Sequence, residues 1–306
     1  MTLQLRNPHS VLAVLQHRPA DVLEIQLGAG GGDAWAQVRA EAEQLGVPLR
    51  QTSSQQADAA SRPRSKRGDR RRPSSGRDSG SRDATRRDQS GRDQAGREQS
   101  GRDGAGRQNP AHATVKERPA TAVEELVADV GPNDLFLALD QLQDPQNVGS
   151  IFRTAAFFGV RGIVMTQNRA APLTGVTYDV ASGGMEAVPF AQETNLRRAL
   201  QTMRDAGVWL LGSSEHAETS IHDVPRDRAW VVVVGNEEQG LRRLTQEDCD
   251  VVCRIPGVHG PEANRPGVQG PGGNSAADAV ADPAPDPVTS LNVAVATSIL
   301  LSSLRR

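Results

Sequence analysis

The stretch from Trp230 to Leu241 has the sequence WVVVVGNEEQGL. Five consecutive apolar residues are followed at once by a polar loop that lies between Gly235 and Gly240. A short continuous apolar run is typical of a strand covered on both faces, as in parallel sheets whose crossover helices pack on each side. The stretch therefore predicts a parallel α/β sheet that carries a polar loop at the end of one strand.

The same alternation of strands and helices extends through the C-terminal half of the chain. Strands are expected at Leu135–Leu139, Gly162–Met165, Val208–Leu211, Trp230–Val234 and Val251–Ile255. Helices are expected at Val148–Phe158 with Asn147 as N-cap, at Asn195–Ala206 before Gly207, and at Leu291–Leu304 with Ser290 as N-cap. Ligands of open parallel sheets bind at the carboxyl ends of the strands. The loops after Leu139, Val234 and Ile255 should therefore share one crevice.

The N-terminal residues 1–50 predict a separate small α/β unit. Its expected elements are a short helix capped by Ser10, a strand at Val22–Leu27, a helix at Asp33–Leu45 that ends at Gly46, and a short strand at Val47–Leu49. The glycine-rich turn Gly28–Gly32 lacks the complete fingerprint and the acidic partner of a dinucleotide site. A plain turn is the favoured interpretation.

Two segments have the composition of insertions. Residues 51–109 are rich in Arg, Gly, Ser and Asp, and Ser61–Gln108 alone holds 15 Lys and Arg against 7 Asp and Glu in a chain of formal net charge −2. With almost no apolar side chains to bury, this segment should be disordered. The segment is either a solvated tether or an arm that holds RNA. It contains no aromatic side chains that could stack on bases, so neither interpretation is favoured. Residues 258–288, rich in Gly, Pro, Ala and Asp, are either a lid or a neutral insertion.

Several classes of protein and site are disfavoured by the composition. The 306 residues contain no run of about eighteen apolar residues, and the start of the chain is interrupted by polar side chains, so we expect no membrane span, no signal peptide and a cytoplasmic location. Cys249 and Cys253 alternate with valines and should share one core face of a strand. No His, Asp and Glu cluster has the spacing of metal ligands, so no metal is expected.

Three loops carry the chemistry, and they follow one another in a fixed order. The first is DQLQDPQNVGSIFRTA from Asp140 to Ala155, the second is Gly235–Leu241, and the third opens at Ile255 and resumes at Ser290. Together they resemble the three motifs of the SpoU, or TrmH-like, branch of the SPOUT RNA methyltransferases, over about Leu135 to Leu304. The matching residues are Asn147, Gly149 and Arg153 in the first motif, Gly235, Asn236, Glu237, Gly240 and Leu241 in the second, and Ile255, Pro256, Ser290, Leu291 and Asn292 in the third.

The resemblance implies an enzyme that transfers a methyl group from S-adenosylmethionine to a ribose 2′-hydroxyl of RNA. It also implies a trefoil-knotted parallel-sheet domain at 131–306, a homodimer, and RNA that crosses the subunit boundary. The stretch ASGGMEAVPF at 181–190 is similar to enzymes that methylate a guanosine of 23S rRNA. Residues 1–50 plus 110–130, with His112–Lys116 as a final strand, resemble the ribosomal-protein-like RNA-binding domain of those enzymes.

The same resemblance implies roles for individual residues. Arg153, Asn147 and Glu237 are the candidate catalytic residues. The candidate cofactor-binding residues are Gly235, Asn236, Gly240, Leu241, Ile255, Pro256, Ser290, Leu291 and Asn292. In the family the arginine at position 153 is proposed to activate the hydroxyl, but a guanidinium stays charged far above neutral pH, which favours a role in stabilising the developing alkoxide. Glu237 would either accept the proton or hold Asn147, and Ala294 stands where the family usually has a hydroxyl residue.

Other functions remain open at this point. A methyltransferase acting on tRNA would use the same motifs, and a non-catalytic rRNA-binding assembly factor could keep the fold without the reaction. A nicotinamide-dependent dehydrogenase is suggested only by the α/β pattern and by Gly28–Gly32, and the chain lacks the fingerprint that such an enzyme needs.

Overall fold

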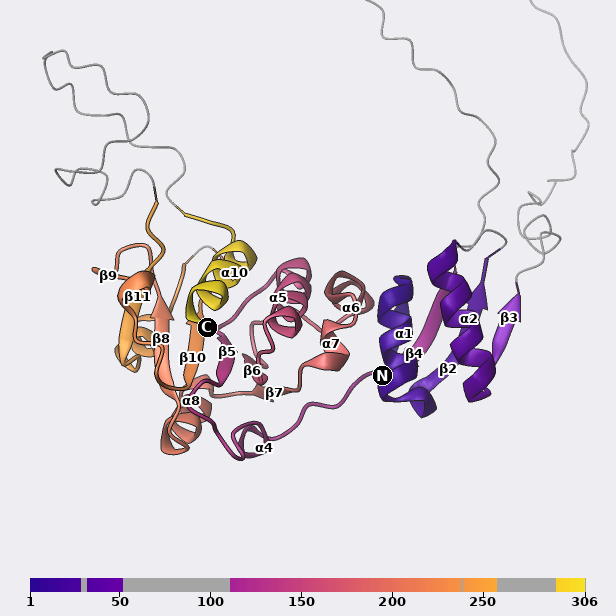
Figure 1. Ribbon diagram of the computed structural model, residues 1–306, viewed down its shortest axis with the longest axis horizontal. Helices are drawn as coiled ribbons and strands as arrows, with labels where there is room; N and C mark the ends of the chain where they lie inside the picture. The colour runs from indigo at the N-terminus through magenta and orange to yellow at the C-terminus, as the bar shows by residue number, and fades with distance from the viewer. Residues whose placement is uncertain (29–31, 52–110, 238, 258–289, 306) are drawn as a thin grey trace, which may run out of the picture. The chain divides into compact units, whose positions relative to one another are not determined.

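The computed structural model describes residues 1–28, 32–51, 111–237, 239–257 and 290–305 (Figure 1). Met1–Gln51 and Pro110–Arg306 belong to one compact unit that contains two sheets. The two predicted insertions, 51–109 and 258–288, lie outside the described residues apart from Gln51. Since the knot depends on the path of the second insertion, the knot stays a prediction, as do the predicted domain boundaries.

The larger sheet has seven strands in the order β7-β6-β5-β10-β8-β11-β9, and all its pairings are parallel. The strands are β5 (Leu135–Leu139), β6 (Gly162–Thr166), β7 (Phe190–Glu193), β8 (Trp209–Ser213), β9 (Thr219–Ser220), β10 (Trp230–Val234) and β11 (Val251–Arg254). The predicted α/β fold class with a parallel sheet is confirmed.

Helices cover both faces of this sheet, which explains why β10 is apolar throughout. Trp230, Val232 and Val234 pack with side chains of α5 (Pro145–Phe157) and α10 (Val293–Leu304). Val231 and Val233 point the other way, toward α4 (Val123–Leu126) and α8 (Leu196–Asp205). Figure 1 shows the sheet between these two layers. Each fully buried valine contributes roughly 1.5–3 kcal/mol of transfer free energy, so this central strand holds the layers together.

Shorter elements complete this part of the chain. They are α6 (Gly175–Ala181), α7 (Gly184–Ala187), α9 (Arg243–Glu247) and the 3-10 turn Ile221–Asp223. A second 3-10 turn, Pro19–Asp21, lies in the N-terminal part of the chain, just before Val22.

Three predicted N-caps were wrong, and two of these errors concern candidate functional residues. Helix α5 begins at Pro145, and Asp144 is its N-cap, with the carboxylate accepting from the Gln146 amide at 2.8 Å. An Asp–Pro pair suits the N-cap and the first helical position better than asparagine does two residues later. Helix α10 is capped by Asn292, whose Oδ1 accepts from the Ala294 amide at 2.9 Å, and not by Ser290.

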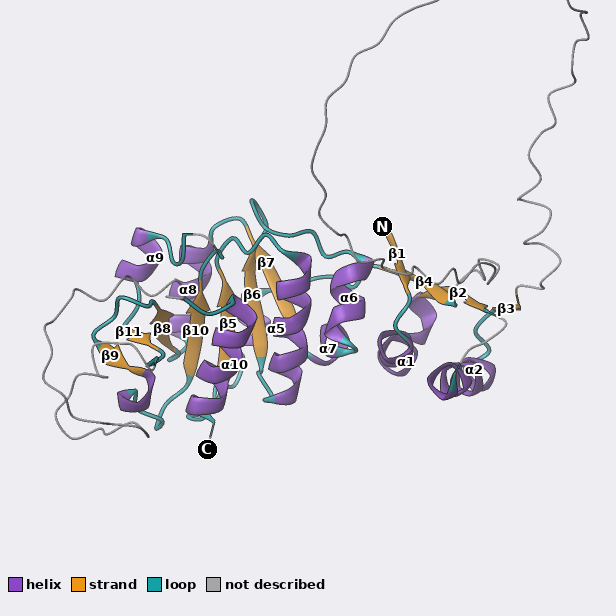
Figure 2. Ribbon diagram, turned by 90° about the horizontal axis from the view of Figure 1, so that it is seen from above, coloured by secondary structure: helices purple, strands orange, loops and turns teal. Residues whose placement is uncertain are grey.

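The smaller sheet has the strand order β1-β4-β2-β3. Its strands are β1 (Thr2–Leu5), β2 (Val22–Leu27), β3 (Leu49–Gln51) and β4 (His112–Lys116), and its helices are α1 (Pro8–His17) and α2 (Asp33–Leu45). Figure 2 shows both helices on the same side of this sheet. The predicted final strand at His112–Lys116 is confirmed, and it lies between β1 and β2. Asn7, not Ser10, caps α1.

The two cysteines do not share a face, which corrects the prediction. Cys249 precedes β11 and packs with the α8 layer, whereas Cys253 lies within β11 and packs with the α5 and α10 layer. Both are free thiols, and burial raises the pKa of each to about 12. Among the described residues no group of three or more side chains could hold a metal ion, and no helix is long and apolar enough to span a membrane.

The thiol pKa values predict that the native protein resists alkylation. At about pH 8 a thiol with a pKa near 12 is ionised to roughly one part in ten thousand, and only the thiolate reacts. Iodoacetamide followed by mass spectrometry should leave Cys249 and Cys253 unmodified in the folded protein and label both after unfolding in guanidinium. Rapid labelling of native Cys253 would contradict the described packing.

Candidate functional site

A cavity of about 500 Å³ opens at the carboxyl ends of β8, β10 and β11. Its walls mix polar and apolar side chains from four segments of the chain. The lining residues are Ser213, Ser214, Glu215, His216, Val234, Gly235, Asn236, Glu237, Gln239, Gly240, Leu241, Gln246, Ile255, Ser290, Leu291, Asn292, Val293 and Ala296. Strands brought side by side by the parallel sheet therefore deliver loops that are distant in sequence to one edge.

The loop after β10 is a tight turn that only glycine permits at its two ends. Asn236 and Gly240 exchange two backbone hydrogen bonds, of 3.1 and 2.9 Å. A Cβ atom on Gly235 would lie 2.1 Å from the carbonyl of Gly240, and Gly240 itself has a φ of 65°. A side chain at the first position would collide, and at the second it would be strained. The two glycines therefore fix the shape of the turn at the cavity wall.

A buried carboxylate anchors the end of this turn to β5. Asp140, directly after β5, accepts hydrogen bonds from Arg242 Nε and Thr245 Oγ1, both at 2.9 Å. Asn236 also donates its side-chain amide to the Gln141 carbonyl at 3.0 Å. A buried charge needs such partners, so Asp140 ties the first and second loops together.

A chain of side-chain hydrogen bonds links all three predicted motifs. Asn292 donates its amide to Asn147 Oδ1 at 3.0 Å, and Asn147 donates its amide to Glu237 Oε1 at 3.1 Å. The direction of this chain is fixed at one end, because Asn292 Oδ1 is already used as the cap of α10. The amide of Asn292 must therefore face Asn147.

The carboxylate of Glu237 lies at the other end of the chain. Partial burial raises the pKa of Glu237, but hydrogen bonds from Asn147 and from backbone amides outweigh it and hold the pKa below its ordinary value. The backbone donors include Gln143 and Asp144, both at 3.3 Å. A carboxylate with these donors stays ionised at neutral pH and is a weak proton acceptor. This favours the second of the two expected roles, in which Glu237 holds Asn147.

The predicted site residues separate into three groups. Most of the predicted cofactor residues line the cavity: Gly235, Asn236, Gly240, Leu241, Ile255, Ser290, Leu291 and Asn292. Glu237 lines it as well, Asn147 joins it only through the hydrogen-bond chain, and Pro256 is not part of its wall. Arg153 does not line it either. That side chain is exposed on α5 and has no polar partner within the described part of the chain.

Sequence reasoning missed the wall formed by Ser213, Ser214, Glu215 and His216. Ser213 is the last residue of β8, and the other three directly follow this strand, which pairs with β10. Their loop therefore opens at the same edge as the loop after Val234. The strand order was the missing signal, because the motifs alone do not reveal which strand lies next to β10.

Part of the chain is similar in sequence to known proteins. Residues 134–262 match the model of the SpoU rRNA Methylase family. A Nitrosomonas europaea protein named 23S rRNA (guanosine-2'-O-)-methyltransferase RlmB is 38% identical over 146 residues, which are 48% of this chain and 56% of that protein. A Bacillus subtilis protein named putative TrmH family tRNA/rRNA methyltransferase YacO is 38% identical over 121 residues, 40% of this chain and 49% of that protein. The chain thus spans about half the length of the curated relatives it matches.

Solved structures agree on the fold across nearly the whole chain. The SpoU methyltransferase AviRb from Streptomyces viridochromogenes, in complex with AdoMet, has a TM-score of 0.62 at 17% identity, covering 99% of this chain and 89% of that one. An AdoMet-bound rRNA methyltransferase from Sinorhizobium meliloti has a TM-score of 0.60 at 17% identity, covering 99% and 87%. The expected SpoU-type fold is confirmed.

The turn after β10 predicts a clear effect of one added methyl group. Gly235→Ala should lower the free energy of unfolding by about 1–3 kcal/mol, because the new Cβ must displace the backbone of Gly240. Urea denaturation followed by circular dichroism measures this change. Gly131→Ala is the matched control, since its added Cβ would meet nothing closer than 3.5 Å. Equal stability of the two variants would contradict the described turn.

Proposed function

We propose that this chain transfers a methyl group from S-adenosylmethionine to a ribose 2′-hydroxyl of RNA, because residues 134–262 match the model of the SpoU rRNA Methylase family. The proposed target is a guanosine of 23S rRNA. The observation that carries this proposal is the hydrogen-bond chain from Asn292 through Asn147 to Glu237, which gathers three separate motifs at one cavity.

The cavity fits S-adenosylmethionine by size and by chemistry. Its volume of about 500 Å³ lies within the range of roughly 300–1,000 Å³ that small-molecule sites occupy. Ile255, Leu291 and Val293 offer apolar surface for a purine ring, while the turn from Gly235 to Gly240 offers backbone groups. When bound, the cofactor supplies an electrophilic methyl group on a sulfonium. Pro256, next to Ile255, is proposed to keep its neighbour's carbonyl in place.

The protein's own part in the reaction is to position groups and to supply charge. Holding two reactants in line can provide about 7–11 kcal/mol of a barrier, and the pinned Asn147 and Asn292 are suited to that work. Arg153 presents an exposed guanidinium with a side chain that makes no internal polar contact in the described part of the chain. We infer that it stabilises the developing ribose alkoxide.

A homodimer goes with this proposal, with RNA crossing the subunit boundary. Helices α5 and α10 pack side by side, and each exposes a large apolar side chain: Phe157 is 84% and Val295 49% exposed. Apolar surface of this kind favours association with a second copy. Arg153 lies on α5 outside the cavity of its own subunit. In the proposed dimer, Arg153 of one subunit lies near the cavity of the other.

The remaining parts of the proposal concern the substrate and the small sheet. The part of the chain that forms the four-stranded sheet is proposed to bind RNA. The protein is proposed to act in the cytoplasm, and its reaction is proposed to need no metal. A tRNA substrate is the second candidate, since relatives such as the Bacillus subtilis protein are named for tRNA and rRNA alike. A non-catalytic assembly factor would keep the fold but would not need the intact chain of hydrogen bonds that ends at Glu237.

The function is tested by cofactor titration and by mapping of methyl groups. Isothermal titration of the full chain with S-adenosylmethionine should show binding, and 2′-O-methylation should disappear from one guanosine of 23S rRNA in cells that lack the protein. Loss from tRNA instead would replace the substrate proposal. Absence of binding heat together with an unchanged methylation map would refute the enzyme and leave the assembly factor.

The proposed role of Arg153 predicts a specific kinetic defect. Arg153→Lys keeps the charge but loses the planar fork, and we expect kcat to fall roughly 10-fold to 100-fold with unchanged cofactor affinity. Single-turnover methylation of RNA measures the rate. Arg198→Lys, on exposed α8 at the opposite face of the sheet, is the control and should keep its activity. Near-normal turnover of the Arg153 variant would remove the need for the guanidinium fork.

A further inference from the structure

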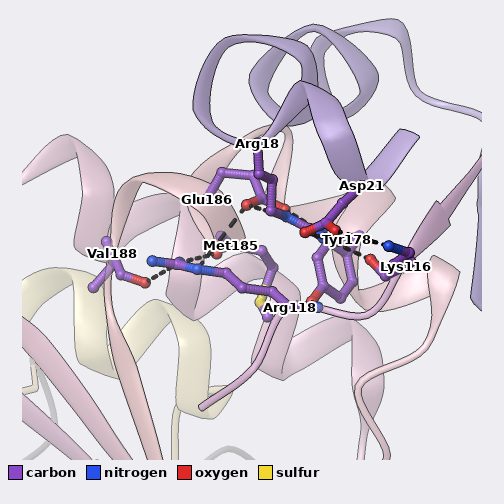
Figure 3. Close-up of polar contacts among 8 residues, drawn as sticks. All are labelled: Arg18, Asp21, Lys116, Arg118, Tyr178, Met185, Glu186 and Val188. Carbon is purple, nitrogen blue, oxygen red and sulfur yellow. Dashed lines mark hydrogen bonds and ion pairs between the residues drawn. The ribbon is translucent and has the colours of Figure 1, made fainter. Parts of the chain in front are cut away.

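A buried carboxylate joins the smaller sheet and its helices α1 and α2, here called the smaller unit, to the part of the chain that forms the larger sheet. Glu186 on α7 has a side chain only 2% exposed, and it accepts from Arg18 Nε and Nη2, both at 2.9 Å. Arg18 follows α1, and it also donates to the Lys116 carbonyl at 2.6 Å. Figure 3 shows both guanidinium nitrogens directed at the carboxylate. This is the bidentate geometry that makes an arginine–carboxylate pair directional.

A second arginine closes the cluster from the other side. Arg118, just after β4, lies 4.0 Å from Glu186 and donates to the carbonyls of Met185 and Val188, the latter at 2.9 Å. Its guanidinium also lies over the ring of Phe190, 5.8 Å from the centroid. Arg18 and Arg118 thus both hold the single turn of α7.

The contact extends along α6 through the backbone. The Asp179 carboxylate accepts from the amides of Arg6 and Asn7, at 2.9 Å each, and Ser10 donates to the Tyr178 carbonyl at 2.7 Å. A Cβ on Gly175 would lie 2.2 Å from the Gln4 carbonyl oxygen. The smaller unit is therefore packed on α6 and α7 without room for a side chain at the closest point.

The far side of α7 rests on the helix that carries Arg153. A Cβ on Gly184 would lie 2.6 Å from the Phe152 carbonyl oxygen and 2.8 Å from the Arg153 amide nitrogen. Phe190 and Phe152 also meet edge to face, with centroids 5.8 Å apart. Glu186 is thus two residues from a backbone contact with Arg153, and a packed path runs from the smaller unit to α5.

We propose that Glu186 is a positioning residue that determines which nucleotide is methylated. By fixing the four-stranded unit on α6 and α7, it sets the distance between RNA held by that unit and the cavity. This inference rests on the proposed function, because it needs an RNA substrate that contacts both parts. If the smaller unit is fixed, the RNA that it binds has one position relative to the cavity. If the unit is only tethered, the bound RNA adopts many positions.

The test compares substitutions that loosen the contact to different degrees. Glu186→Gln removes the charge, and Arg18→Lys keeps the charge but loses the fork. The double variant reports their coupling. Glu24→Gln is the matched control, because Glu24 pairs with the exposed Arg50 at 3.4 Å inside the same unit. All are made in the full chain.

Four readouts separate positioning from simple stability. Hydrogen exchange at the Arg6 and Asn7 amides reports docking, because both donate to Asp179. Methylation of 23S rRNA from cells lacking the protein reports KM and the modified nucleotide. A short hairpin that carries the mapped nucleotide reports the rate at the cavity alone, and titration with S-adenosylmethionine reports cofactor affinity.

We expect Glu186→Gln to speed exchange at both amides, to raise KM for 23S rRNA about tenfold or more, and to spread methylation to neighbouring riboses. Cofactor affinity and kcat on the hairpin should stay within twofold. Arg18→Lys should show the same changes in smaller degree, and Glu24→Gln none.

Faster exchange with an unchanged KM and an unchanged target would overturn the proposal, and so would unchanged exchange. An equal fall of cofactor affinity and of hairpin kcat would also overturn it, because the role would then be structural. If the wild-type chain methylates no RNA, the proposed function has failed, and exchange at Arg6 and Asn7 still decides whether Glu186 docks the unit.

Discussion

The hydrogen-bond chain Asn292–Asn147–Glu237 is the contact on which the candidate site depends. Its members come from segments as much as 145 residues apart in sequence, so only the completed sheet brings them together. A neutral hydrogen bond contributes about 0.5–1.5 kcal/mol net and one to a charged group about 1.5–3 kcal/mol. These hydrogen bonds are therefore too weak to stabilise the whole fold. They can, however, favour one arrangement of the three loops that the sheet brings together.

Close backbone contacts supply the rigidity that these weak bonds need. Gly149 lies where a Cβ would come 2.6 Å from the Thr177 carbonyl oxygen, and Gly184 repeats this arrangement against Phe152. Helix α5 is thus fixed by α6 and α7 on one side and by α10 on another. Asn147 and Arg153 inherit their positions from that packing. The short distance between the helices explains why glycine is required at positions 149 and 184.

Sequence reasoning succeeded where one local pattern decides the outcome. Apolar runs located β5 and β10 to the residue, whereas the strand at His112–Lys116 was expected only from the family resemblance. It failed where two neighbouring residues compete for one role, as Asp144 and Asn147 do for the cap of α5. It also failed where strand order matters, since the loop after β8 reaches the cavity only because β8 pairs with β10.

The wrong cap has a mechanistic consequence. A capping Asn147 would turn its Oδ1 toward the amides of its own helix, and these would compete with Asn292 for that oxygen. Since Asp144 is the N-cap of α5, the side chain of Asn147 can connect the other two motifs. The carboxylate of Glu237 accepts hydrogen bonds that keep it ionised. A carboxylate held in this way stabilises an arrangement and does not exchange protons readily. The cavity wall thus holds a fixed anion, Glu237, while Arg153 presents an exposed guanidinium on α5 outside the cavity. Under the proposed reaction, this is the combination expected where orientation and charge, and not an internal base, lower the barrier.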